Sequence, residues 1–200
     1  MLTDHEAGGG DSSGGAPGRG AAAPGDVLAF WFAPGMACRW FAADQTLDEE
    51  LTRRFTPLVE AALAGRRDRW AETADGALAL CLVLDQFPRH IWRGTPRAFS
   101  CDARAREVAK AALAAGHDRA LPADRRLFFY LPFEHSEDCA DQERCMALMA
   151  SLDDPELLAY ARRHRDIVAR FGRFPHRNAI LGRESTVEEL AFLAEPGSSF

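Results

Sequence analysis

Apolar side chains recur at intervals of three or four residues along most of the chain, a spacing that places them on one face of an α-helix. Between positions 46 and 63 this stripe consists of Leu51, Phe55, Leu58, Val59, Ala62 and Leu63. The stretch 77–84 is apolar on nearly every side, which is typical of a central, buried helix. The pattern predicts helices at 27–32, 46–63, 77–84, 102–115, 122–130, 138–152, 155–171 and 176–181, and a last helix after 186.

Residues suited to helix caps precede these segments. Thr46 and Thr186 are each followed three residues later by glutamate, the spacing of a capping box, and Pro155 stands at a first helical position. The predicted N-caps are Asp26, Thr46, Asp75, Asp154 and Thr186. Because no segment alternates like a strand, we predict an all-α fold of seven to nine helices.

The first 25 residues differ from the rest of the chain. They hold eight of the sixteen glycines, together with many alanine, serine and proline residues. A segment of this composition buries too little apolar surface to offset its chain entropy. We therefore predict a disordered tail over residues 1–25 and a single helical domain over residues 26–200.

Composition and charge narrow the classes of function. Only one of the 24 basic residues is lysine, and the formal net charge is −6, so the chain lacks the electrostatic footprint of general nucleic-acid binding. The longest apolar run, 77–84, is far shorter than the roughly 20 residues that span a membrane. Five cysteines without a Cys-x-x-Cys pair fit a reducing compartment. We expect a cytoplasmic protein that contacts no membrane.

Three short segments place polar residues beside aromatic and proline anchors, unlike a solvated helix face. The first is 85–94, where Asp85 lies on the inner stripe of the predicted central helix. A carboxylate aimed at the core needs a cationic partner, and Arg89 and Arg93 are near in sequence. A planar guanidinium can hold a carboxylate through two hydrogen bonds. This segment is either part of a ligand site or an internal staple.

The second segment, 132–142, combines carboxylates with an imidazole. Glu134 and Asp138 flank His135, and carboxylates that orient a histidine let it exchange protons near neutral pH. Gln142 follows one helical turn later. The spacing matches no zinc motif, so we assign no metal ligand and no cofactor. In the structural alternative, Asp138 caps the helix that follows.

The third segment, 171–183, gathers guanidinium groups around the start of a short helical turn. Such groups, together with free N–H groups at a helix start, suit a carboxylate or a phosphate. The alternative is a set of salt bridges to the acids of the second segment. The polar residues concerned are Arg173, His176, Arg177, Asn178 and Arg183.

These segments resemble those of a bacterial family known as domain of unknown function 924. The likeness extends over about residues 26–200 and includes Phe30-Trp31-Phe32, Phe99-x-x-Asp102 and the ending Ser185-Thr186-x-Glu188-Glu189-x-x-Phe192-Leu193. The resemblance implies a fold similar to tetratricopeptide repeats, a right-handed stack of helical hairpins, and it implies no particular reaction. One departure is His90, where the resemblance leads us to expect asparagine.

Three functions follow from these segments. In the first, His135 transfers a proton with the help of Glu134 and Asp85, and a small anionic molecule is bound by residues chosen from Arg89, Arg93, Asp138, Gln142, Arg173, His176, Arg177, Asn178 and Arg183. In the second, the concave face of the helical stack binds a peptide segment of another protein. In the third, the polar residues are structural salt-bridge staples only.

Overall fold

The computed structural model describes residues 22–198, and over that range the backbone forms helices joined by turns, without a β-strand. This confirms the predicted all-α class. The predicted tail falls almost wholly on residues 1–21, which lie outside the described range. Between residues 22 and 198, no helix is both long enough and apolar enough to cross a membrane.

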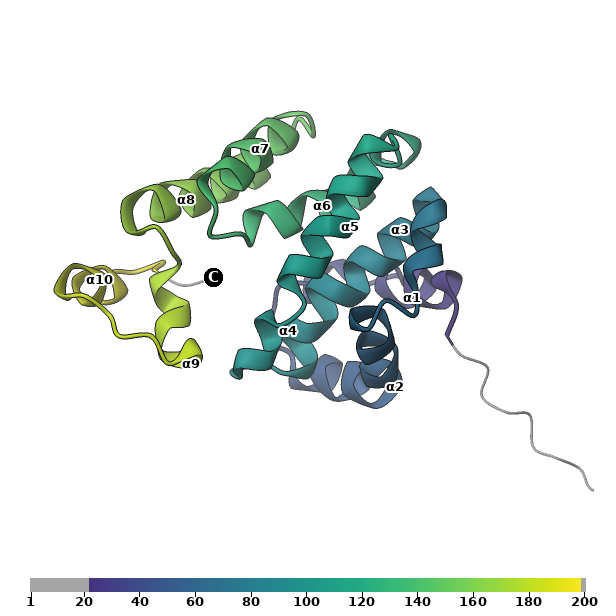
Figure 1. Ribbon diagram of the computed structural model, residues 1–200, viewed down its shortest axis with the longest axis horizontal. Helices are drawn as coiled ribbons and strands as arrows, with labels where there is room; N and C mark the ends of the chain where they lie inside the picture. The colour runs from purple at the N-terminus through teal and green to yellow at the C-terminus, as the bar shows by residue number, and fades with distance from the viewer. Residues whose placement is uncertain (1–21, 199–200) are drawn as a thin grey trace, which may run out of the picture.

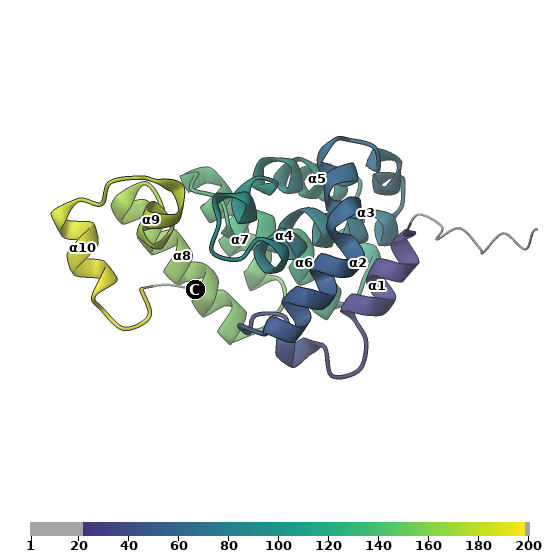
Figure 2. The same cartoon turned by 90° about the horizontal axis from the view of Figure 1, so that it is seen from below.

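The helices follow one another from one end of the molecule to the other. Figures 1 and 2 both show α1 and α2 at one end and α9 and α10 at the opposite end. The α-helices are α1 (Pro24–Trp31), α2 (Gln45–Leu63), α3 (Ala74–Cys81), α4 (Phe87–Ile91), α5 (Asp102–Ala114), α6 (Ala123–Glu134), α7 (Cys139–Ala150), α8 (Pro155–Phe171), α9 (Asn178–Leu181) and α10 (Val187–Leu193).

A nearly continuous helical rod runs through the centre of the fold from α3 to α4. The π-helical turn η3 (Leu82–Gln86) joins the two helices, and the N–H of Phe87 donates to the carbonyl of Leu82, five residues earlier. Pro88 follows directly and has no N–H to offer. Residues 76–88 are all buried, because α1, α2, α5 and α6 pack around the rod. Isolated π turns of this kind are frequent at functional sites.

Helix α6 continues beyond its predicted end at Tyr130. It runs to Glu134, with Pro132 inside it. Phe133 is fully buried next to this proline, and the packing outweighs the one hydrogen bond that the ring removes. The longer helix therefore brings Glu134, and His135 as its C-cap, to the edge of the core.

The last part of the chain packs on this framework through α7 and α8. Helix α7 lies against both α6 and α8 (Figure 1). The C-terminal segment, residues 172–198, packs on the end of α8 through a small apolar core that is separate from the main one. In this core Phe174 and Phe192 of the segment meet Ile167, Val168 and Phe171 of α8. Stacking in the manner of tetratricopeptide repeats stays a prediction, because sequential helix packing is shared by many helical folds.

Two helices begin as predicted. Asp154 caps α8 by accepting two backbone N–H groups, and Thr186 and Glu189 form a reciprocal capping box on α10. Gly172 ends α8 in the left-handed conformation, with φ 69°, as expected for a C-terminal glycine.

The other three predicted N-caps are wrong. A cap needs an extended backbone, and in each case an earlier residue already has that conformation. The displaced aspartates and threonine lie inside the first helical turn, where Asp26, for example, accepts the N–H of Ala23. The observed caps are Ala23, Asp44 and Thr73 in place of Asp26, Thr46 and Asp75.

Gly76 allows α3 to pack directly on the 3₁₀-helix η2 (Asp68–Glu72). A Cβ at Gly76 would lie 2.1 Å from the carbonyl oxygen of Trp70. Gly76→Ala is therefore expected to lower the free energy of unfolding by about 1–3 kcal/mol, measured by urea denaturation. Gly25→Ala, in the first turn of α1, is the control, because its added Cβ meets no described atom within 4 Å. Equal stability of the two variants would contradict the prediction.

Candidate functional site

Asp85 stands on η3 and is only 1% exposed. Its Oδ1 lies 2.8 Å from Nδ1 of His135, and its Oδ2 accepts a hydrogen bond of 2.7 Å from Gln86. Nη1 of Arg89 lies 3.5 Å from Oδ1. Burial raises the pKa of Asp85, but His135 and Arg89 lower it by more, so this pKa lies below its usual range. The group is a carboxylate at neutral pH.

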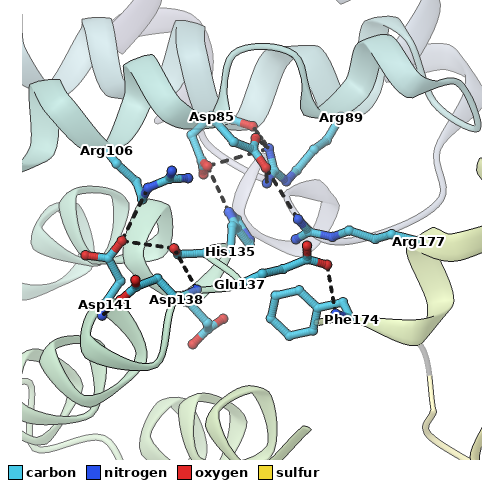
Figure 3. Close-up of polar contacts among 12 residues, drawn as sticks. Asp85, Arg89, Arg106, His135, Glu137, Asp138, Asp141, Phe174 and Arg177 are labelled. Atoms are coloured by element: carbon cyan, nitrogen blue, oxygen red, sulfur yellow. Dashed lines mark hydrogen bonds and ion pairs between the residues drawn. The ribbon is translucent and has the colours of Figure 1, made fainter. Parts of the chain in front are cut away.

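Asp102, the first residue of α5, lies between two arginines. Arg89 donates to its two oxygens at 3.0 and 3.2 Å. Nη1 of Arg177 donates to Oδ2 at 3.5 Å. Figure 3 shows Arg177 reaching from the C-terminal segment toward Arg89. A chain of alternating charges thus joins the central rod, α5 and the C-terminal segment.

Arg177 is buried, with 7% of its surface exposed, between two aromatic rings. The guanidinium carbon lies 4.7 Å from the ring centre of Phe99 and 4.6 Å from that of Phe174. The long bond to Asp102 is the one hydrogen bond that this guanidinium makes within residues 22–198, and its buried Nε has no partner there. Burial, helped by the charge of Arg89, lowers the pKa of Arg177 to about 10. The positive charge of Arg177 is therefore incompletely compensated.

His135 presents one ring nitrogen to the core and keeps the other for the surface. Its Nδ1 faces Asp85, and a carboxylate at this nitrogen selects the tautomer that carries the proton on Nδ1. The lone pair then lies on Nε2. Burial and the charge of Arg89 lower the pKa of His135, so the ring is neutral near pH 7. The side chain is 16% exposed and contributes to a cleft.

This cleft has a volume of about 430 Å³ and lies between α5, the end of α6 and the C-terminal segment. One side of its lining is apolar and includes Pro96, Phe99, Ala103 and Leu181. The polar lining consists of Asp102, Arg106, His135, Glu137 and Arg177. A concave site with apolar walls and a few convergent polar groups is the usual form of a small-molecule site.

Gln142 and Asp138 shape the turn that carries His135. The Nε2 of Gln142, which is fully buried, donates to the carbonyl oxygens of Glu134 and Ser136 at 2.7 and 2.6 Å. Asp138 caps α7 by accepting two backbone N–H groups. Both residues were predicted to bind a ligand. The structure places them as supports of the turn and outside the cleft lining.

Glu137 fastens the C-terminal segment to this turn. Arg183 donates to its two oxygens at 2.7 and 2.9 Å, and the N–H of Phe174 donates to Oε1 at 2.8 Å. Burial raises the pKa of Glu137, but Arg183 lowers it by more. Arg183 also donates to Oδ1 of Asn178. Arg183 and Asn178, both predicted ligand residues, therefore lie behind the cleft wall.

Two predicted ligand arginines lie away from the cleft. Arg93 stands beyond the end of α4 and donates to both oxygens of Asp48 on α2, at 2.6 and 2.9 Å. Arg173 donates to both oxygens of Glu189 on α10, at 2.6 and 2.8 Å. The structure does not bring these two residues to His135 and Arg177.

Glu134 and His176 point into the protein beside the cleft. Oε1 of Glu134 lies 3.8 Å from Nδ1 of His164, and Cys145 lies on its other side. Burial raises the pKa of Glu134 to about 8. The ring of His176 lies 5.6 Å from that of Phe174, and burial lowers the pKa of His176 to about 4. Neither residue lines the cleft.

The sequence reading missed Asp102, Arg106 and Glu137 as members of the cleft. Asp102 and Arg106 stand four residues apart on α5 and so share one helix face, which is a readable signal. Glu137 is one of the carboxylates of the second segment, but it is not among the residues predicted to bind a ligand. Its pairing with Arg183 spans 46 positions and is a salt bridge of the kind expected in the alternative for the third segment, which ties its arginines to the acids of the second.

Comparison with known proteins confirms the family resemblance. The family model described as "Bacterial protein of unknown function (DUF924)" matches residues 27–197. The chain is also similar to the "Structure of Protein of Unknown Function ATU0120 from Agrobacterium tumefaciens", with 46% identity and a TM-score of 0.82, over 86% of this chain and 96% of that chain. Among curated proteins none matches.

The buried carboxyl of Glu134 makes the stability depend on pH. With a folded pKa of about 8 against an ordinary value of 4.5, the folded state holds a proton that the unfolded state releases. The free energy of unfolding is expected to fall from pH 7 to 9, by at most about 1.4 kcal/mol per pH unit from this group. Glu134→Gln is expected to flatten the fall, as measured by urea denaturation.

Glu137→Gln is the matched control for this experiment. The pKa of Glu137 is lowered, so its effect on stability lies at acid pH and the slope from pH 7 to 9 should persist. If Glu134→Gln keeps the full wild-type slope, the assigned pKa of Glu134 is wrong.

Proposed function

We propose that this chain, which belongs to the bacterial DUF924 family of unknown function, binds a small anionic molecule in the cleft and accepts a proton from it at His135. The observation that carries the proposal is the state of Arg177. Its guanidinium is buried but makes one long hydrogen bond within the described part of the chain. A bound anion would complete its pairing.

The other arginines predicted for the site differ from Arg177 in their hydrogen bonding. Each donates at least two hydrogen bonds to a single carboxylate, as expected of a structural staple. These pairs are Arg89 with Asp102, Arg93 with Asp48, Arg173 with Glu189 and Arg183 with Glu137. Arg177 is more deeply buried than these four and has the weakest contact. A structural role alone leaves this difference unexplained.

The proton acceptor follows from the orientation of His135. A general base needs a free lone pair, a neutral state near the working pH and a group that fixes its ring. His135 meets these conditions through the hydrogen bond to Asp85 and through its lowered pKa. Gln142 holds the backbone on either side of it. The peptide-binding alternative has no comparable contact in its support.

Arg177→Lys tests the anion site. The variant keeps the charge but loses the planar fork that holds an anion through two hydrogen bonds. Acetate, benzoate, sulfate and phosphate are titrated at low ionic strength while the melting temperature is followed. The wild type is expected to be stabilised by about 2.7 kcal/mol at a hundredfold excess of a binding anion over its dissociation constant. The variant should show at least tenfold weaker binding.

Arg173→Lys is the matched control, because Arg173 lies in the same segment and pairs with Glu189 outside the cleft. It should bind anions like the wild type. If Arg177→Lys does not fold, anion binding by the wild type is followed instead through the NMR signals of the His135 ring. A wild type that no anion stabilises or perturbs would leave the polar residues as staples and defeat the proposal.

Anion affinity is also expected to depend on pH through His135. Its pKa is lowered from 6.5, so the ring gains a positive charge below that pH. A cation in the cleft attracts the anion, and the dissociation constant should decrease once the pH falls below 6.5. Calorimetry with an anion that stays ionised in this range measures the trend. His135→Gln should abolish it, and an unchanged trend in that variant would exclude His135 from the site.

A further inference from the structure

The ionised side chains at and next to the cleft sum to one net positive charge. Asp85 and Asp102 equal Arg89 and Arg177 in number, although Arg177 makes only the long contact to Asp102, and Glu137 is paired with Arg183. Beside Arg106 of the cleft lining, the single carboxylate of Asp141 forms ion pairs with two cations, Arg106 and Lys110. Because His135 is neutral, the network has room for one negative charge. A second negative charge would lie beside the carboxylates of Asp102 and Glu137 without a cationic partner of its own, which is unfavourable.

The shape of the donor group agrees with this charge. A guanidinium presents parallel N–H groups in a plane, which match two oxygens of a carboxylate or of a phosphate. The rings of Phe99 and Phe174 both contact the guanidinium of Arg177 and restrict its movement. Arg106 lines the same cleft, and its Nε lies 3.3 Å from Oδ2 of Asp141, which is a long ion pair. The fork accepts either kind of anion, and the single excess charge favours a monoanion over a dianion.

The rest of the cleft lining is suited to hydrocarbon. Pro96, Phe99 and Ala103 approach it from the turn before α5 and from α5 itself, and Leu181 approaches it from the end of α9. Such a wall adds affinity for an apolar group attached to the anion, roughly fourfold for each CH₂ that becomes buried. The cleft thus combines one charge-fixing position with an apolar surface.

We propose that the ligand is a monocarboxylate with a compact apolar body, an aryl or branched alkyl carboxylic acid that also bears the O–H or N–H group whose proton His135 accepts. Its carboxylate lies on Arg177 and its body lies against Phe99 and Leu181. This inference rests on the proposed function and specifies the class of anion. It assigns Leu181, a residue of the C-terminal segment, to ligand selection.

Calorimetric titration at pH 7.5 with acetate, benzoate, inorganic phosphate and phenyl phosphate tests the inference. Benzoate is expected to bind at least tenfold more tightly than acetate and more tightly than phenyl phosphate, which carries the same ring on a dianion. Leu181→Ala should weaken benzoate binding several-fold and leave acetate binding unchanged. Leu190→Ala, on the exposed face of α10, is the matched control and should alter neither.

The outcomes separate the two proposals. If phosphate or phenyl phosphate binds and the carboxylates do not, the anion site stands and the carboxylate inference is wrong. If acetate and benzoate bind equally, or if Leu181→Ala has no effect on benzoate, the apolar part of the inference is wrong. If none of the four compounds binds, both proposals fail.

Discussion

The carboxylate of Asp85 is the constraint on which the arrangement depends. It stands on the innermost helical rod, shielded from water, where an unpaired charge costs several kcal/mol. His135 at the end of α6 and Arg89 one turn along the rod satisfy it. Arg89 in turn pairs with Asp102, and Asp102 reaches Arg177. A series of oppositely charged side chains therefore extends from Asp85 at the centre of the fold to Arg177 at the wall of the cleft.

This outward chain explains how one set of residues contributes to both stability and chemistry. Near the centre, each polar atom of Asp85 has close partners, so the charge is fixed and the fold is held. At the periphery the pairing becomes incomplete, and Arg177 is left with a single long contact. Buried charges that lack full compensation are commonest at functional sites. The same series of contacts thus ends at the guanidinium of Arg177, which retains hydrogen-bond donors for an anion.

The sequence was informative wherever a contact is local. The apolar stretch 77–84 indicated the central rod, and the spacing of Asp85 and Arg89 indicated their proximity, because both depend on the helical repeat. It was misleading for Arg93, since α4 ends at Ile91 and the repeat no longer applies. It was silent on Arg177 and Asp102, which are 75 positions apart, because only the packing of the C-terminal segment joins them.

The separate apolar core of the C-terminal segment has a consequence for how the cleft is assembled. Arg177 and Leu181 belong to residues 172–198, and their side of the cleft rests on the small cluster around Phe174 and not on the main core. Units with few buried apolar contacts open at a lower free energy than the whole protein. We therefore expect the C-terminal segment to open at a lower free energy than the main core, and the cleft to be lost with it before the protein unfolds globally.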